Sequence, residues 1–204
     1  SLYNTEDKSI LEGLLPTVDI ILFDPRGCGQ SDKSEPIYCT LDSYIKDIES
    51  IRHFFHLDAN QFILFGQSYG AIAALGYAIA HSDQLKKLFL IGGVASGEFV
   101  KEAIDELIEI GTPEQKQYAK IIWDGTFPES AEGMANYYEV MGPLYFYDFT
   151  PGRAAPSLTD NIDILNFGFG HFLKAFDYRP HLKKISCPTL ILWGKNEWIF
   201  NKKQ

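Results

Sequence analysis

Residues 62–80, FILFGQSYGAIAALGYAIA, decide the fold, because the pattern of side chains changes there at a single serine. The residues before it, 61–67, form a continuous apolar run that predicts a buried strand. The residues after it, 69–82, predict a helix of small side chains. Ser68 stands at the junction. It is either a nucleophile presented on a tight strand-to-helix turn or a polar residue that opens a helix.

The junction fits the pattern G-x-S-x-G, with Gly66 and Gly70 on either side of the serine. A serine hydroxyl attacks only when it is presented to a base and kept from competing hydrogen bonds, and a sharp turn whose crowding excludes flanking side chains achieves this. The backbone N–H of Tyr69 would then face a developing oxyanion. The alternative is that Ser68 is a helix N-cap, since serine is favoured at that position.

Three further apolar runs predict buried strands, at residues 17–24, 86–93 and 187–197. Between the first two, residues 40–57 carry apolar side chains at helical spacing, with Thr40 in the N-cap position. Strands that are apolar along their whole length and alternate with helices indicate a parallel sheet covered by helices on both faces. The expected fold class is therefore α/β.

This alternation stops between residues 98 and 178, where the sequence has amphipathic helical patterns, an aromatic-rich passage and many acidic residues, but no buried strand run. We expect an α/β core that begins in residues 1–97, a helical insertion over residues 98–178, and the return of the core in residues 179–204. An insertion of this kind closes over a site and shapes the substrate pocket.

Charge and cysteine content exclude several classes of function. The net charge of -9, without clusters of Lys and Arg, argues against a nucleic-acid partner. No apolar run approaches the ~20 residues of a membrane span, so no membrane partner is expected. Cys28, Cys39 and Cys187 have unrelated spacings, which predicts reduced thiols in a cytoplasmic protein and no metal site. No histidine lies near Cys28 in the sequence, so we expect it to be a small buried residue.

Three segments resemble the α/β-hydrolase family in order and separation. DIILFDPRGCGQSD, residues 19–32, resembles a strand of that family and the loop after it, GQSYG at 66–70 resembles the nucleophile elbow, and PTLILWGKNEW at 188–198 resembles the strand that precedes the acid of the catalytic triad. Within the family the first two segments are most similar to the proline iminopeptidase group. The resemblance implies an α/β-hydrolase fold with a helical cap over residues 98–178.

The same resemblance implies roles for individual residues. Ser68 would be the nucleophile and the N–H of Tyr69 an oxyanion donor, while Asp24 and Arg26 would fix the loop and take no part in the chemistry. Counting from the glycine of GKNEW, the acid would be Glu197. Glu98, directly after the run at 86–93, is a rival acid.

The histidine that should follow Glu197 in this family is not found in residues 198–204, so the catalytic histidine is none of those in this chain. All five histidines precede the acid: His53, His56, His81, His171 and His181. The loop that supplies the second oxyanion donor in this family is not found before residue 17 either. We therefore expect the natural polypeptide to be longer at both ends.

The resemblance implies a serine hydrolase that needs no metal or organic cofactor and acts on a small peptide or a small acyl substrate. An aminopeptidase that releases N-terminal proline from peptides is the first expectation. A carboxylesterase or lactonase of the same fold is the alternative. A non-catalytic binding protein that keeps the fold is the alternative from another class.

Overall fold

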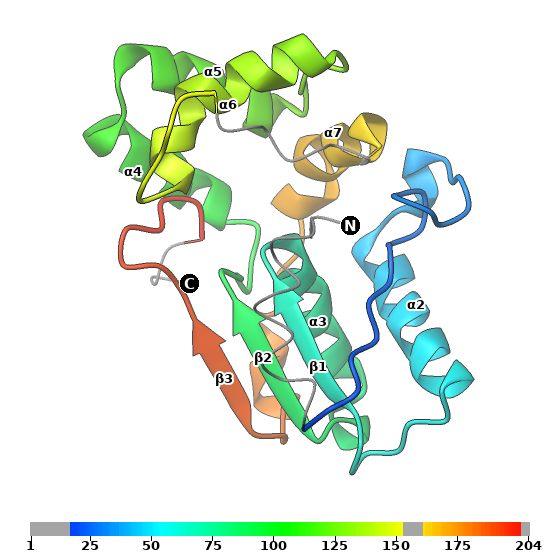
Figure 1. Cartoon of the computed structure of the whole chain (residues 1–204). Helices are drawn as coiled ribbons and strands as arrows, with labels where there is room; N and C mark the ends of the chain where they lie inside the picture. Colours follow the sequence, from blue (N-terminus) through cyan, green and yellow to red (C-terminus); the bar gives the residue numbers. More distant parts are fainter. Residues whose placement is uncertain (1–16, 153–160, 201–204) are drawn as a thin grey trace.

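The computed structural model describes residues 17–152 and 161–200 (Figure 1). Its centre is a three-stranded parallel sheet in the order β1-β2-β3. Phe65, Phe89 and Leu190 stand side by side across it. The strands are β1 (Ile63–Gln67), β2 (Lys87–Ile91) and β3 (Thr189–Leu192). Because all three strands run in the same direction, their carboxyl ends meet at one edge of the sheet.

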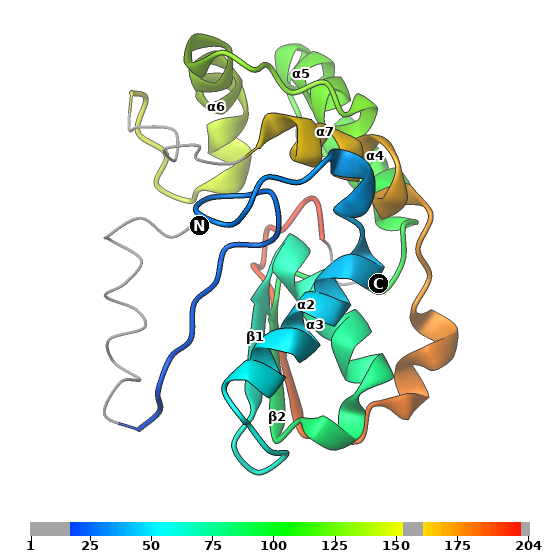
Figure 2. The same cartoon turned by 90° about the vertical axis from the view of Figure 1, so that its right-hand side faces the viewer.

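Two long helices lie on one side of the sheet, the second packed on the strands and the first packed against the second, as Figure 2 shows. They are α2 (Leu41–Phe54) and α3 (Tyr69–Ala80). Thr40 caps α2 as predicted, since its hydroxyl oxygen accepts a hydrogen bond from the backbone N–H of Ser43 at 3.3 Å. Short 3-10 helices lie beside them at η1 (Pro36–Tyr38), η2 (Ser82–Gln84) and η4 (Arg179–Lys184).

Small side chains on α3 let this helix approach the sheet and its neighbours closely. Leu88 and Leu90 of β2 are buried in one hydrophobic cluster with the alanines of α3. A Cβ at Gly76 would come within 2.5 Å of the Tyr178 hydroxyl and 2.7 Å of Ile45. The other face of these strands exposes Phe65 and Leu190. The prediction of a buried strand at 187–197 is right about the strand and wrong about its burial, because β3 is exposed along its length at the edge of the described sheet. The helix of small residues predicted after Ser68 is confirmed.

A second group of helices lies beyond the carboxyl edge of the sheet (Figures 1 and 2). We call it the α4–α7 layer. It consists of α4 (Phe99–Ile110), α5 (Pro113–Asp124), α6 (Ala131–Tyr145) and α7 (Ile162–Gly170), followed by the 3-10 helix η3 (Phe172–Lys174). Phe99, Trp123, Tyr137 and Met141 belong to its buried cluster. Each of the three segments expected from the sequence extends beyond the described residues. The parts that lie outside are residues 1–16 of the first, 153–160 of the second and 201–204 of the third.

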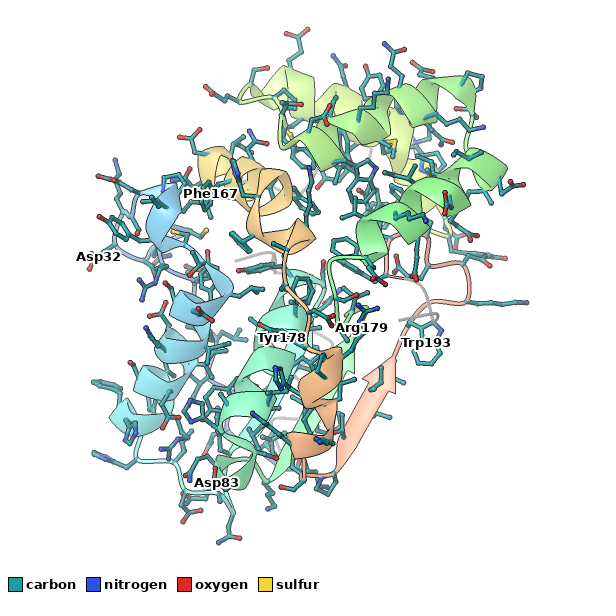
Figure 3. All side chains as sticks on the ribbon, turned by 180° about the vertical axis from the view of Figure 1, so that it is seen from behind. Asp32, Asp83, Phe167, Tyr178, Arg179 and Trp193 are labelled. Carbon is teal, nitrogen blue, oxygen red and sulfur yellow. The ribbon has the colours of Figure 1, made fainter. Side chains whose placement is uncertain are left out.

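Two of the chain passages between the sheet and the α4–α7 layer are bonded to each other. Ser96 and Asp177 form an antiparallel bridge, with Tyr178 N–H donating to the Ala95 carbonyl at 2.7 Å. A Cβ at Gly97 would lie 2.4 Å from the carbonyl oxygen of Lys174, so only glycine permits this approach. In Figure 3, Tyr178 and Arg179 are labelled at this crossing.

The prediction of a buried strand at residues 17–24 is wrong. Residues 18–24 lie outside any strand in the structure, and Leu22 is 54% and Phe23 42% exposed. Figure 2 shows this segment as a blue trace that runs apart from β1. An extended segment becomes a strand only when a neighbouring strand accepts its hydrogen bonds, and within the described residues β1 pairs with β2 alone. Apolar side chains by themselves do not supply that neighbour.

Candidate active site

Ser68 occupies a strained backbone position between β1 and α3. Its φ is 53° and its ψ is -124°, a region that residues other than glycine seldom adopt. The backbone N–H of Ser68 donates to the carbonyl of Ile91 at 2.8 Å, which holds the turn against the end of β2. The turn therefore directs the serine toward the edge where the strands end.

The structure contradicts the alternative that Ser68 is an ordinary N-cap. An N-cap serine has extended backbone angles and accepts a hydrogen bond from the first turn of its helix. Ser68 has a positive φ, and its side chain makes no capping hydrogen bond. Within residues 17–152 and 161–200 its hydroxyl has no hydrogen-bond partner, and the backbone N–H of Tyr69 donates to no acceptor. Both groups are left available to a ligand.

The two glycines of the motif differ in what surrounds them. A Cβ at Gly66 would lie 2.3 Å from the carbonyl oxygen of Gly70 and 2.8 Å from Cα of Ala71, because the first turn of α3 passes directly over β1. A Cβ at Gly70 would meet nothing within 4 Å. The expectation that crowding excludes side chains on both flanks is therefore right for Gly66 and wrong for Gly70.

Glu197 lies at the same edge of the sheet, in the loop after β3. Its Oε1 accepts hydrogen bonds from the backbone N–H groups of Ile199, at 3.0 Å, and Phe200, at 3.2 Å. Its Oε2 lies 3.8 Å from the position of a Cβ at Gly92, the residue after Ile91. Oε1 is thus occupied by backbone donors, and no hydrogen bond to Oε2 is found in the described part of the chain.

Glu98, the rival acid, is engaged elsewhere. Arg179 donates from Nη1 to Oε2 of Glu98 at 2.6 Å and from Nη2 to Oε1 at 3.1 Å. The hydrogen bonds and charge of Arg179 lower the pKa of Glu98. Arg179 also pairs with Asp177 at 2.8 Å. It therefore links the two chain passages that carry Glu98 and Asp177 to each other. Both oxygens of Glu98 are therefore used in an ion pair, whereas Oε2 of Glu197 has no hydrogen-bond partner in the described residues.

None of the five histidines bonds to Ser68. All of them lie in the described part of the chain. His53 pairs with Glu49 at 2.9 Å on α2, and His81 stacks on Tyr77 at the far end of α3. His171 stacks on Phe167 in the α4–α7 layer, while His56 and His181 belong to the turn after α2 and to η4. None of these is placed as the base.

The loop after residue 23 is held by hydrogen bonds within the loop and by an ion pair to α2. Asp24 Oδ2 accepts the backbone N–H of Gln30 at 2.9 Å, and this bond is the largest of the influences that lower the pKa of Asp24. Arg26 donates to both carboxylate oxygens of Asp47 on α2. These contacts give Asp24 and Arg26 the loop-fixing role that the resemblance implies. Cys28, expected to be buried, is only partly so and packs against the core cluster.

Two aromatic residues near the elbow could not be placed from the sequence. The Tyr69 ring packs edge-on against Tyr44 at 5.3 Å and against Phe172 at 6.1 Å, and burial raises the pKa of its phenol well above the ordinary value. Trp198, directly after Glu197, is 1% exposed. Its ring is buried in the cluster of the α4–α7 layer.

Two open cavities do not include the candidate catalytic residues, and the described residues contain neither a metal-ion cluster nor a helix able to span a membrane. These cavities, of about 410 and 450 Å³, are lined by residues of the α4–α7 layer, with Pro36 added in the second, and neither includes Ser68 or Glu197. Among residues 17–152 and 161–200, no three His, Cys, Asp or Glu side chains are grouped to hold a metal ion. No helix in these ranges has the length and apolar character to cross a membrane.

Comparison with known proteins shows the family to which this chain belongs. The whole chain, residues 1–204, matches the family described as the alpha/beta hydrolase fold. It is 30% identical over 186 residues to the proline iminopeptidase PfmaB of Pestalotiopsis fici, covering 88% of this chain and 65% of that protein. It is 31% identical over 191 residues to a proline iminopeptidase of Thermoplasma volcanium, covering 87% and 63%. The chain thus spans slightly under two thirds of the length of both relatives.

The fold also matches solved structures. The esterase RhEst1 of Rhodococcus sp. ECU1013 superimposes with a TM-score of 0.66 at 20% identity, covering 95% of this chain and 68% of the esterase. The superposition shows that the two chains share a fold. An identity of 20% carries no information on the substrate.

Proposed function

This chain belongs to the α/β-hydrolase family, and we propose that it carries the nucleophile and the acid of a serine hydrolase that releases N-terminal proline from peptides. One observation carries the first part of the proposal. Ser68 is held at a φ of 53° with a hydroxyl that has no partner in the described residues. Strain of this kind is retained where the surrounding structure over-determines it, and it is concentrated at reactive sites.

In the proposed reaction the Ser68 hydroxyl attacks the carbonyl carbon of the scissile bond while a histidine takes its proton. The carbonyl oxygen becomes an oxyanion, and the backbone N–H of Tyr69 donates to it at the amino end of α3. The histidine then protonates the leaving amine. Water, activated by the same histidine, releases the acid product and restores Ser68.

Glu197 is proposed to orient the histidine through Oε2, because Oε1 already accepts two backbone N–H groups. The proposal assigns neither the histidine nor the second oxyanion donor to a residue, since none of the five histidines is hydrogen-bonded to Ser68. A negatively charged carboxylate beside an imidazole stabilises the imidazolium that forms during the attack.

The substrate part of the proposal rests on the relatives named proline iminopeptidases, which are 30 and 31% identical to this chain. The α4–α7 layer is proposed to act as a cap that covers the scissile bond and excludes water. Its acidic side chains suit a substrate with a free, positively charged amino terminus. No metal or organic cofactor takes part in the proposed chemistry.

A fluorophosphonate probe tests the nucleophile in the protein at its full natural length. The expected result is one covalent adduct on Ser68, lost in Ser68→Ala and lost after heat unfolding. Folded protein that hydrolyses substrate without an adduct on Ser68 would refute the assignment. Folded protein that neither labels nor hydrolyses anything would favour a binding protein of this fold.

Chromogenic proline amides and short acyl esters then separate the substrate classes. The proposal expects kcat/KM for a proline amide to exceed that for the same amide carrying an acetylated amino group by at least about a hundredfold. Blocking the amine removes its charge and leaves the scissile bond unchanged. Equal rates on both amides, or activity confined to esters and lactones, would replace the aminopeptidase by a carboxylesterase or lactonase.

A further inference from the structure

The residues that follow Glu197 leave the sheet and enter the α4–α7 layer. Trp198 is 1% exposed, and Ile199 and Phe200 are also buried. All three belong to the same hydrophobic cluster as Phe99 and Trp123. The loop that carries the candidate acid is therefore anchored in the layer above the sheet.

Three helices of the layer contribute to this anchor. The Trp198 ring lies 6.1 Å from the Trp123 ring of α5 and 6.0 Å from the Tyr145 ring of α6, both edge-on. Phe200 packs on Phe99 of α4 at 5.1 Å. Edge-on aromatic pairs at these separations have a preferred mutual orientation as well as a buried area. A shift of α5 or α6 would move the Trp198 ring, and a shift of α4 would move Phe200.

The sheet holds the same loop much less firmly. Leu192 and Trp193, at the end of β3, are each 48% exposed, and Figure 3 shows Trp193 directed away from the molecule. The backbone N–H of Gly92 donates to the Leu192 carbonyl at 2.9 Å, and after that point the loop is bonded mainly to itself, through Glu197 N–H and the Gly194 carbonyl at 3.2 Å.

The direction of the Glu197 carboxylate is set by this anchored segment. Its Oε1 accepts from the N–H groups of Ile199 and Phe200, the two residues that follow Trp198 into the layer. Tyr145, whose ring contacts the Trp198 ring, is bonded through its hydroxyl to the Tyr137 hydroxyl at 2.7 Å.

We propose that Trp198 is a positioning residue that fastens the carboxylate of Glu197 to the α4–α7 layer, so that displacement of the layer also displaces the acid. The proposal rests on the assignment of Glu197 as the acid of a serine hydrolase. It means that the acid is aligned with its histidine only while the layer is seated on the site. Catalytic power is then coupled to closure over the substrate.

A double-mutant cycle on the full-length protein tests this coupling. Trp198→Leu is expected to lower kcat about ten- to a hundredfold with little change in KM, because a displacement of about 1 Å at a reacting group has effects of this size. In a Glu197→Gln background the same substitution is expected to lower kcat less than about twofold. An equal loss in both backgrounds would mean that Trp198 supports packing alone, and would overturn the proposal.

The pH profile gives a second readout that a packing role would not move. A carboxylate raises the pKa of a neighbouring imidazole, so Trp198→Leu should shift the acid limb of the kcat/KM profile to lower pH by about half a unit or more. An unshifted limb together with a lowered kcat would count against the proposal.

Trp193→Leu is the matched control, since Trp193 lies on the same loop before Gly194 and makes no ring contact in the described residues. It should leave kcat and the pH profile unchanged. Trp198→Phe keeps an aromatic ring and removes no hydrogen bond found in the described residues, because the buried Trp198 Nε1 has none there. This conservative variant should recover most of the activity, and it replaces Trp198→Leu if that variant does not fold.

These outcomes are distinct from failure of the proposed function. If Ser68→Ala keeps full activity, the serine hydrolase assignment fails before Trp198 is considered. If Ser68 is labelled and required, and Trp198→Leu behaves as Trp193→Leu does, only the positioning role is refuted.

Discussion

The backbone N–H of Ser68 donates to the carbonyl of Ile91 at 2.8 Å, and this bond joins the elbow to the end of the neighbouring strand. The next residue, Gly92, has a positive φ of 54°, and a Cβ there would lie 3.8 Å from Oε2 of Glu197. One short path of backbone therefore connects the candidate nucleophile to the candidate acid. The two residues lie far apart in the chain, and both lie at the carboxyl edge of the sheet.

The two glycines of the elbow should respond differently to the same substitution. Gly66→Ala places a methyl group 2.3 Å from the Gly70 carbonyl, which is backbone and cannot rotate away, so we expect a loss of about 2–3 kcal/mol in the free energy of unfolding. Gly70→Ala meets nothing within 4 Å and lies in a helix, so it should be neutral or stabilising by up to about 1 kcal/mol. Urea titration of both variants measures the difference, and equal losses would contradict it.

The strained backbone of Ser68, with its φ of 53°, should lower the free energy of unfolding, whereas its hydroxyl should have little effect on it. Ser68→Ala keeps the Cβ at a positive φ and removes a hydroxyl that bonds to nothing in the described residues, so its stability should equal that of the wild type within about 0.5 kcal/mol. Ser68→Gly relieves the strain and should be more stable than Ser68→Ala by about 1 kcal/mol. Both variants should be inactive. A glycine variant less stable than the alanine variant would show that the turn is not strained.

Substitution of Glu197 should lower kcat far more than substitution of Glu98. Glu197→Gln keeps the size of the side chain and removes its charge, so we expect kcat to fall about a thousandfold or more. Glu98→Gln breaks an exposed pair with Arg179, and such pairs contribute little, so kcat should stay within about threefold. Steady-state kinetics on both variants tests the assignment. A large loss for Glu98→Gln with a small one for Glu197→Gln would exchange the two roles.

A polar cluster between α2 and α3 should make stability depend on pH. Arg52 donates two hydrogen bonds to Glu49, at 2.9 and 2.7 Å, and these lower the pKa of Glu49 to about 2 against the opposing effect of burial, with help from the Tyr77 hydroxyl. Because the folded pKa lies below the unfolded one, the stabilisation is present above about pH 4.5 and is lost as pH falls through about 2.

Unfolding of wild type and Glu49→Gln at several pH values measures this effect. The difference in free energy of unfolding should be on the order of 2–3 kcal/mol at pH 7 and less than half of that at pH 3. Glu109→Gln, at an exposed position of α4, is the control and should differ little from wild type at both values. A gap between wild type and Glu49→Gln that stays constant with pH would contradict the role of the Glu49 charge.

Local sequence patterns predicted much of the fold correctly. The strand before Ser68, the helix after it and the cap at Thr40 all depend on residues within a few positions of each other. Periodicity and capping chemistry act over this range, so they can be read without knowledge of the rest of the molecule. The prediction of a strand at 17–24 was wrong because a strand also requires a hydrogen-bonding neighbour, which the apolar run does not specify.

The candidate site shows the same division. The G-x-S-x-G spacing determined which serine lies at the turn, and the acid position followed from the end of a later strand. Only the tertiary structure decided that Gly66 is crowded and Gly70 is not, that Glu98 is held by Arg179, and that Trp198 is buried in the α4–α7 layer. These features depend on backbone and side chains brought together from distant parts of the chain. Local sequence selects the elements, and the packing between layers decides which partners their functional side chains meet.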